Sequence, residues 1–364
     1  MSKPLWLIAY HHPCNDGYAA ALAAFVGVAL LAPLREQASS GAPAAPPAGG
    51  GPLTSAALGA AREAAGVAFF PLAVFESEAS RTARVCAAVG PLTRVLLLDF
   101  SGGLSFIRAL CGACARVILL DHHKTAAEDV AALRADLPAN LEVHFDMGRS
   151  GATLARDYFN LAGAGAALAA AVGGAAPAAA LLRFLELVED HDLWRHAHAD
   201  STALSAGLAD AKLDLDLAAN GDALAFAFRM DLPALIARGR AAEAATRALV
   251  DAEVARAFAA DVPGEPPLRC LAVLTQQPQL RSEVGNALAT LSAARGLHPA
   301  AIVAYEEPAA AAAAPQYKVS FRSLGAFDTT PFARRWGGGG HANASSCMVP
   351  AAEVLAWRAE TAPA

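Results

Sequence analysis

The chain has 364 residues, a net charge of −6 at pH 7 and a hydrophobic fraction of 55%. The length exceeds what one hydrophobic core usually supports, so we expect about two domains of roughly 100 to 200 residues each, and a small disulfide-stapled scaffold is excluded. The acidic balance excludes a basic field that holds long duplex DNA. Much of the apolar excess is alanine, which does not by itself indicate a membrane protein.

The N-terminal region predicts a buried helix rather than a membrane span. The longest uncharged apolar stretch, Tyr18 to Leu34, has about 17 residues and contains Pro33, which puts it at the short limit for crossing a bilayer. Lys3 is the only positive charge among the first ten residues, so we expect no secretory signal. Together with six scattered cysteines, this predicts reduced thiols, a cytoplasmic location and no membrane partner.

Alternating patterns in the N-terminal half predict an α/β fold. Short runs rich in leucine and β-branched residues are separated by segments of helical character. This alternation is typical of βαβ units, which form a parallel, doubly wound sheet with helices on both faces. The predicted strands are Leu5 to Ala9, Val67 to Phe70, Arg94 to Leu98, Arg116 to Leu120 and Leu141 to Phe145.

The C-terminal half predicts a helical connector followed by a smaller α/β domain with a mixed sheet. The expected domains are residues 1–200 and 262–355, joined by a connector over 201–261 that is dense in Ala, Leu and charges at helical spacing. Segment 37–52, built of Ala, Gly, Pro and Ser, is expected to be a disordered insert. The second domain should contain strands Leu268 to Leu274, Ala301 to Tyr305 and Tyr317 to Phe321, with a helix over Glu283 to Arg295.

Polar residues follow the predicted strands, where parallel sheets bind their ligands. Each carboxylate alone could be a helix N-cap and each imidazole a satisfied core residue. Together they provide the carboxylate and imidazole ligands that Mn²⁺, Mg²⁺ or Zn²⁺ take, in a number that fits a dinuclear site. The residues are His11, His12, Asp16, Asp99, Asp121, His122, His123 and Asp146.

A run of four glycines, Gly337 to Gly340, precedes His341 near the C-terminal end of the sequence. Glycines expose backbone N–H groups without side-chain obstruction, which is one way to bind an anion. A flexible linker has the same composition, but apolar segments flank this run on both sides. We therefore favour an anion-binding loop.

Taken together, the motifs of the chain resemble those of the DHH phosphoesterase superfamily, in the branch that carries a DHH-associated C-terminal domain. The resemblance extends from Leu5 to about Val349, apart from the inserts. The motifs, in chain order, are LLLDFS around Asp99, LLDHHKTA around Asp121-His122-His123, RSGATLA from Arg149, LVEDHDLW around Asp190 and Asp192, FRS at Phe321 to Ser323, and GGGH at Gly338 to His341.

The resemblance implies a phosphoric ester hydrolase with two divalent metal ions, Mn²⁺ first and Mg²⁺ as an alternative. It implies metal ligands at His11 or His12, Asp16, Asp99, His122 and Asp190, with Asp99 bridging and Asp192 left as the structural alternative to Asp190. His123 would lie near the scissile phosphate. Substrate would be bound by Arg322, Gly338, Gly339, Gly340 and His341 of the DHH-associated domain, while residues 1–200 would form the metal-binding catalytic domain.

The expected reaction is hydrolysis of phosphodiester bonds by a hydroxide activated between the two ions. Short single-stranded oligonucleotides and linear or cyclic dinucleotides are the expected substrates, because the chain is acidic; a homodimer is left open. Two other hypotheses for the function stay open. One is an exopolyphosphatase or pyrophosphatase, and the other is a nucleotide-binding pseudoenzyme, suggested by Cys14 where relatives have an Asp and by Ser346 where relatives usually have a Gly.

Overall fold

The computed structural model describes residues 3–35, 53–73, 76–123, 126, 131, 137–306 and 315–359. The predicted disordered insert at 37–52 lies outside these residues. Contacts divide the chain into two compact units, Met1–Ala242 and Glu243–Ala364.

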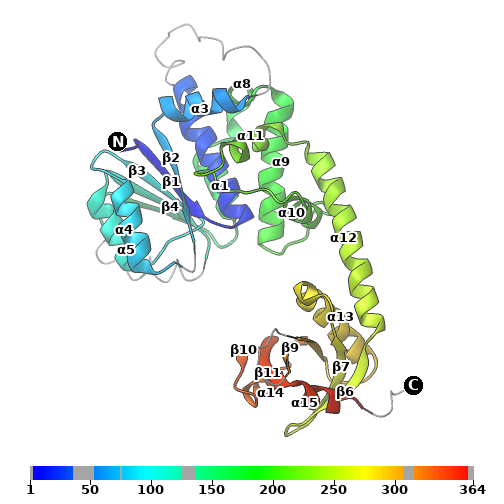
Figure 1. Cartoon of the computed structure of the whole chain (residues 1–364). Helices are drawn as coiled ribbons and strands as arrows, with labels where there is room; N and C mark the ends of the chain where they lie inside the picture. The colour runs from blue at the N-terminus through cyan, green and yellow to red at the C-terminus, as the bar shows by residue number, and fades with distance from the viewer. Residues whose placement is uncertain are drawn as a thin grey trace. The chain divides into compact units, whose positions relative to one another are not determined.

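The first unit contains a five-stranded parallel sheet in the order β2-β1-β3-β4-β5, which confirms the predicted doubly wound α/β fold. In Figure 1 the sheet lies between α4 and α5 on one side and α1 on the other. The strands are β1 (Trp6–His11), β2 (Val67–Leu72), β3 (Arg94–Leu98), β4 (Arg116–Asp121) and β5 (Leu141–Phe145). The helices are α1 (Asn15–Phe25), which continues as the π-helix η1 (Val26–Leu31), α3 (Ser55–Ala64), α4 (Glu78–Ala88), α5 (Leu104–Ala113), α7 (Gly151–Tyr158), η2 (Ala162–Ala164), α8 (Ala166–Val172), α9 (Ala175–Asp192), α10 (Ser201–Asp210), α11 (Gly221–Arg229) and α12 (Leu232–Ala255), whose last part belongs to the second unit.

Alternate residues of the central strands pack on opposite sides of this sheet. Ile8 and Leu96 contribute to the core under α1, α7 and α9, whereas Leu7 and Val95 contribute to the core under α4 and α5. Burial of both faces is why these strands read as continuous apolar runs. The carboxyl ends of β1, β3 and β4 therefore meet at one edge, where the chain turns into loops and helix N-termini.

The apolar N-terminal helix is part of the core, as predicted. Asn15–Arg35 is long and apolar enough to cross a membrane by length and composition, but 78% of its most apolar window is buried against the rest of the protein. α8 and α9 would pass the same test only as a pair bent by 97°. Neither observation is more than weak evidence for a span, because core helices of this length pass the test too.

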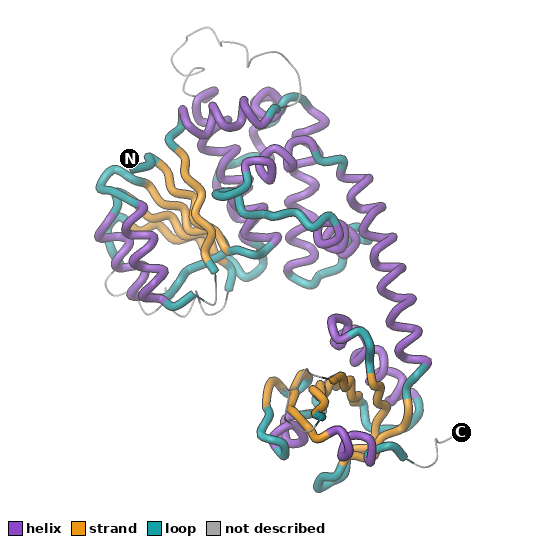
Figure 2. Tube along the Cα trace, viewed as in Figure 1, coloured by secondary structure: helices purple, strands orange, loops and turns teal. Residues whose placement is uncertain are grey.

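The second unit contains a six-stranded mixed sheet in the order β10-β11-β9-β8-β7-β6, in which only β7 and β8 pair in parallel. This confirms the predicted smaller α/β domain; Figure 2 separates its strands from its helices by colour. Its elements are β6 (Phe258–Val262), β7 (Leu268–Leu274), η3 (Pro278–Leu280), α13 (Arg281–Ala294), β8 (Ala300–Glu306), β9 (Gln316–Ser323), α14 (Thr330–Arg334), β10 (Gly339–His341), β11 (Ala344–Pro350) and α15 (Ala351–Ala356). β6, apart from Val262, lies inside the segment expected to be a helical connector, and β10 begins inside the expected glycine loop.

Candidate metal centre

Asp99 lies in the middle of a cluster of carboxylates and imidazoles at the carboxyl ends of β1, β3 and β4. It directly follows β3, is 2% exposed and has φ 56°, a left-handed conformation uncommon outside glycine. Its Oδ2 is 3.1 Å from Nδ1 of His11, at the end of β1, and its Oδ1 is 3.0 Å from Nε2 of His122, just after β4. One carboxylate thus contacts imidazoles from two different strands.

Asp16, in the first turn of α1, is fixed by the N-terminus of α7. Its two oxygens accept hydrogen bonds from the backbone N–H groups of Gly151, at 2.6 Å, and Ala152, at 2.9 Å. A Cβ at Gly151 would lie 2.7 Å from Cβ of Asp99 and 2.9 Å from Oδ2 of Asp16. Only glycine fits there, which explains the RSGATLA motif, and Oδ2 of Asp16 remains 3.6 Å from Nε2 of His122.

The structure brings Asp192, and not Asp190, into the cluster. Oδ2 of Asp192 lies 3.5 Å from Nε2 of His122. The carboxylate of Asp190 instead accepts hydrogen bonds from the backbone N–H groups of Ala197, at 2.9 Å, and His198, at 3.1 Å. Both residues lie in the last turn of α9, but two positions along a helix differ by about 200° in direction. Asp190 therefore anchors the following loop in this structure, and the geometry favours Asp192, the alternative that the sequence left open.

Of the two histidines at the carboxyl end of β1, His11, its last residue, contacts Asp99, whereas His12, which follows the strand, has no place in the metal-capable groups of the described residues. His12 lines a separate cavity of about 370 Å³ together with Cys14 and Asp214. Its Nδ1 is buried, without a hydrogen-bond partner among the described residues. Of the two histidines that the sequence left open, His11 is therefore the one placed to share a ligand site with Asp99.

The first residue of the DHH motif orients the third. Oδ1 of Asp121 accepts hydrogen bonds from the backbone N–H groups of His122, at 2.7 Å, and His123, at 3.1 Å, and is 2.8 Å from Nδ1 of His123. The side chain of Asp121 is 1% exposed, whereas that of His123 is 47% exposed. Asp121 therefore fixes the orientation of an imidazole that is about half exposed.

Mutual proximity shifts the acid–base behaviour of these groups. Burial opposes ionisation of Asp99, but hydrogen bonds from His11 and His122 outweigh it and lower its pKa to about 2. Burial and the charges of Asp99 and Asp192 raise the pKa of Asp16 well above its usual value. Burial opposes protonation of His122, yet Asp99, Asp16 and Asp192 raise its pKa. The raised pKa values of Asp16 and His122 mean that the carboxylates gathered here favour a bound positive charge, which is a proton when no metal ion is present.

The donor atoms suit a divalent cation. Three groups of residues, among those that the structure describes, place ligand atoms within 4.8 Å of one another: Asp99, His122 and His123; Asp16, His122 and Asp192; and His11, Cys14 and Asp99. Buried carboxylates beside imidazoles are ordinary ligands of such ions. Next to the cluster is a cavity of about 180 Å³ lined by Asp16 and Asp192, the apolar side chains Leu187, Val188, Leu204 and Leu208, and the polar residues Cys14, Asn15, His191, Ser201 and Ser205.

In the second unit, the glycine run leads into the first strand of a β-hairpin. β10 pairs antiparallel with β11, and His341, Ala344 and Arg322 occupy one rung across β10, β11 and β9. A Cβ at Gly338 would lie 2.1 Å from a backbone oxygen of β11, whereas nothing lies within 4 Å of one at Gly339. Packing therefore explains Gly338 but not Gly339.

Arg322 is anchored beside the N-terminus of α13. Its Nη2 donates to Oγ of Ser282 at 3.4 Å, and its Nη1 donates to the carbonyl of Phe321 at 2.9 Å. Burial and the charge of Arg281 lower its pKa. His341 is exposed. Arg322 and His341 are about two strand spacings, or ~10 Å, apart across the sheet.

No family model and no curated protein sequence matches the chain. Three solved structures that match it are a pGpG-specific phosphodiesterase from Vibrio cholerae (11% identity, 96% of this chain and 95% of that one, TM-score 0.44), the DHH domain of a protein described as a member of a ribosomal protein family (14%, 97% and 85%, 0.39) and an exopolyphosphatase-related protein from Bacteroides fragilis (11%, 94% and 86%, 0.39). In the content and order of its motifs the chain resembles the DHH phosphoesterase superfamily, and the solved structures that it matches include a DHH domain protein.

Proposed function

We propose that this protein is a metal-dependent phosphoesterase that hydrolyses phosphodiester bonds in short oligonucleotides or in linear or cyclic dinucleotides. The observation that carries the proposal is the gathering of His11, Asp16, His122 and Asp192 around the buried Asp99 in overlapping groups of potential ligands, with the half-exposed His123 beside it. One of the matching structures is a pGpG-specific phosphodiesterase, so pGpG is included among the test substrates.

Asp99 is proposed to bridge two cations, because its two oxygens face different partners. Oδ2 faces His11, and Oδ1 faces His122, with Nδ1 of His123 at 3.7 Å. Asp16 and Asp192 would complete the ligand set on the His122 side. When bound, divalent cations of this kind supply an activated water and neutralise charge on phosphoryl oxygens. Mn²⁺ is the proposed metal and Mg²⁺ the alternative.

His123 is proposed to hold the leaving group or a phosphoryl oxygen. Its hydrogen bond to Asp121 raises its pKa, burial acts in the opposite direction, and the Asp99 charge raises it further. With the Nδ1 proton held by Asp121, Nε2 of the protonated ring has a proton to donate. Its exposure leaves that nitrogen accessible to a substrate.

For the second unit we propose substrate binding through Arg322, the glycine hairpin and His341. A guanidinium binds phosphate bidentately, and Gly339 leaves its backbone open to an approaching anion. The net charge of −6 favours a short substrate over long duplex DNA. The assignment of residues 1–200 to catalysis and 262–355 to substrate binding, the cytoplasmic location and a homodimer remain predictions.

The test is hydrolysis of two- to five-nucleotide RNA and of pGpG by the purified chain with Mn²⁺. Asp99→Asn is the decisive variant, since Asn also tolerates a positive φ and preserves the backbone while it removes the charge. We expect Asp99→Asn and Asp192→Asn to lose activity by at least about tenfold, as removal of metal-site partners does. Asp190→Asn is the matched control on the same helical turn.

Unchanged hydrolysis by Asp99→Asn would overturn the proposal. Release of orthophosphate from polyphosphate, without activity on nucleotides, would favour a phosphoanhydride hydrolase instead. Nucleotide binding without turnover under every metal would favour a pseudoenzyme.

A further inference from the structure

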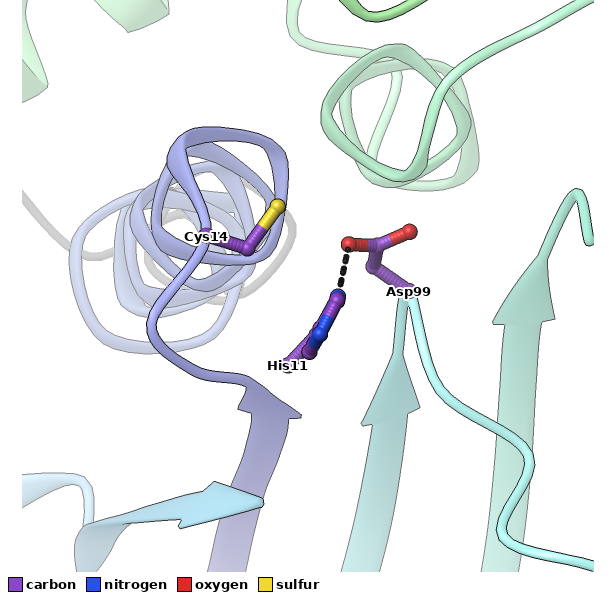
Figure 3. Close-up of side chains that lie close together, drawn as sticks. All are labelled: His11, Cys14 and Asp99. Carbon is purple, nitrogen blue, oxygen red and sulfur yellow. Dashed lines mark hydrogen bonds and ion pairs between the residues drawn. The ribbon is translucent and has the colours of Figure 1, made fainter. Parts of the chain in front are cut away.

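Cys14 stands beside the half of Asp99 that faces β1. Figure 3 shows its sulfur directed toward the Asp99 carboxylate, above the His11 ring whose Nδ1 is 3.1 Å from Oδ2 of Asp99. The ligand atoms of these residues lie within 4.8 Å of one another. We propose that the Cys14 thiolate ligates one of the two cations, so that this half of the centre is a Cys-His-Asp site that selects Zn²⁺ over Mg²⁺ and Mn²⁺. The inference rests on the proposed function for the presence of two cations.

Packing does not account for a cysteine at this position. Cys14 is the residue before the first turn of α1, with φ −154° and ψ 138°, and belongs to none of the hydrophobic cores of the described residues. By contrast, Cys111, Cys270 and Cys347 are buried members of such cores, the usual environment of an unreactive thiol. Cys14 instead lines two cavities next to ionisable side chains.

The two halves of the cluster differ in chemical hardness, with Asp99 between them. On the His122 side the other potential ligands are Asp16 and Asp192, which are oxygen donors, and His123, a nitrogen donor, so this side has two carboxylates besides Asp99 and no sulfur. On the β1 side they are His11 and Cys14, a nitrogen donor and a sulfur donor. Thiolate and imidazole favour Zn²⁺, whereas Mg²⁺ prefers oxygen ligands and resists losing its water shell. On ligation the Cys14 thiol loses its proton to solvent, and the sulfur–metal bond forms.

Cobalt provides a direct readout, because Co²⁺ bound by a thiolate gives a sulfur-to-metal charge-transfer absorption that oxygen and nitrogen ligands do not give. We expect this band when the metal-free full chain is titrated with Co²⁺, and we expect Zn²⁺, but not Mg²⁺, to abolish it. The band should be absent from Cys14→Ser and Cys14→Asp. It should persist in Cys86→Ser, the matched control on α4, whose thiol is also partly exposed but lies outside the metal-capable groups of the described residues.

Two further measurements keep the test decisive if a variant folds poorly. X-ray absorption of the wild-type chain with Zn²⁺ should give a sulfur neighbour at about 2.3 Å. Calorimetry should give a ratio of Zn²⁺ to Mn²⁺ affinity at least about tenfold lower in Cys14→Asp than in wild type, given that even loss of an outer partner costs this much.

A band that survives in Cys14→Ser, or a wild-type chain that binds Co²⁺ without one, would overturn the inference. Hydrolysis is assayed separately. Hydrolysis without sulfur ligation leaves the proposed function standing and refutes the ligand role of Cys14. Sulfur ligation without hydrolysis supports the ligand role of Cys14 and refutes the proposed function.

Discussion

Gly151→Ala tests whether the close contact of α7 with the cluster sets the geometry of the centre. The added Cβ would lie 2.7 Å from Cβ of Asp99 and 2.9 Å from Oδ2 of Asp16, and real Cβ atoms essentially never come so close. Because the glycine N–H also donates to Asp16 at 2.6 Å, α7 cannot move away without losing that bond. Overpacking of this kind costs about 1–3 kcal/mol. At about 2–4 °C per kcal/mol for a unit of this size, the melting temperature should fall by about 2–12 °C.

Differential scanning calorimetry of the full chain measures the fall in melting temperature. Calorimetric titration measures the affinity of the variant for Mn²⁺. We expect the affinity for Mn²⁺ to fall by about 10- to 100-fold, because two of its proposed ligands are displaced. Gly59→Ala is the control: nothing lies within 4 Å of its Cβ on α3, so this substitution should stabilise the helix by about 0.5–1 kcal/mol. If Gly151→Ala melts and binds Mn²⁺ like wild type, the argument from this contact is wrong.

Three further predictions concern single side chains. Gly338→Ala should destabilise the second unit by about 1–3 kcal/mol, because its Cβ meets a β11 backbone oxygen at 2.1 Å, whereas Gly339→Ala should leave calorimetric unfolding unchanged; equal effects would contradict the hairpin argument. Burial opposes ionisation of Glu189, but its hydrogen bonds lower the pKa below 4.5, so its stabilisation is present above that value and is lost as pH falls; urea unfolding of Glu189→Gln should therefore vary less with pH in the acid range. Asp190→Asn should lower the free energy of unfolding by about 1–3 kcal/mol without weakening Mn²⁺ binding. Asp192→Asn should weaken Mn²⁺ binding without lowering the free energy of unfolding. A titration in which both variants lose affinity equally would contradict the different placement of the two carboxylates.

The sequence predicts the parallel sheet well because its central strands are buried on both faces. Arg94–Leu98 has the predicted bounds, and the predicted Arg116 to Leu120 extends by one residue. The connector predicted over 201–261 includes all of β6, Phe258–Val262, except its last residue, because the segment is dense in Ala, Leu and charges at helical spacing. The strand state of β6 depends on antiparallel pairing with β7, a tertiary contact that no local pattern reports.

The candidate site is predictable in its chemistry but not in its geometry. The motifs identify Asp16, Asp99 and His122 because each follows a strand or begins a helix at the same sheet edge. The choice between Asp190 and Asp192 depends on the rotation of α9 about its axis, and the sequence does not determine it. Gly151 was visible as part of a motif, yet its role depends on a contact with Asp16, 135 positions away.

Large sequence separations within the centre have a consequence for folding kinetics. His11 and Asp99 are 88 residues apart, and Asp16 bonds to a backbone 135 residues away. Such contacts form only after long loops have closed and β1 has paired with β3. We therefore expect the ligands to come together late, after the rate-limiting barrier for folding. Bound metal should slow unfolding and leave the refolding rate nearly unchanged, so that the centre protects the finished protein rather than guiding its assembly.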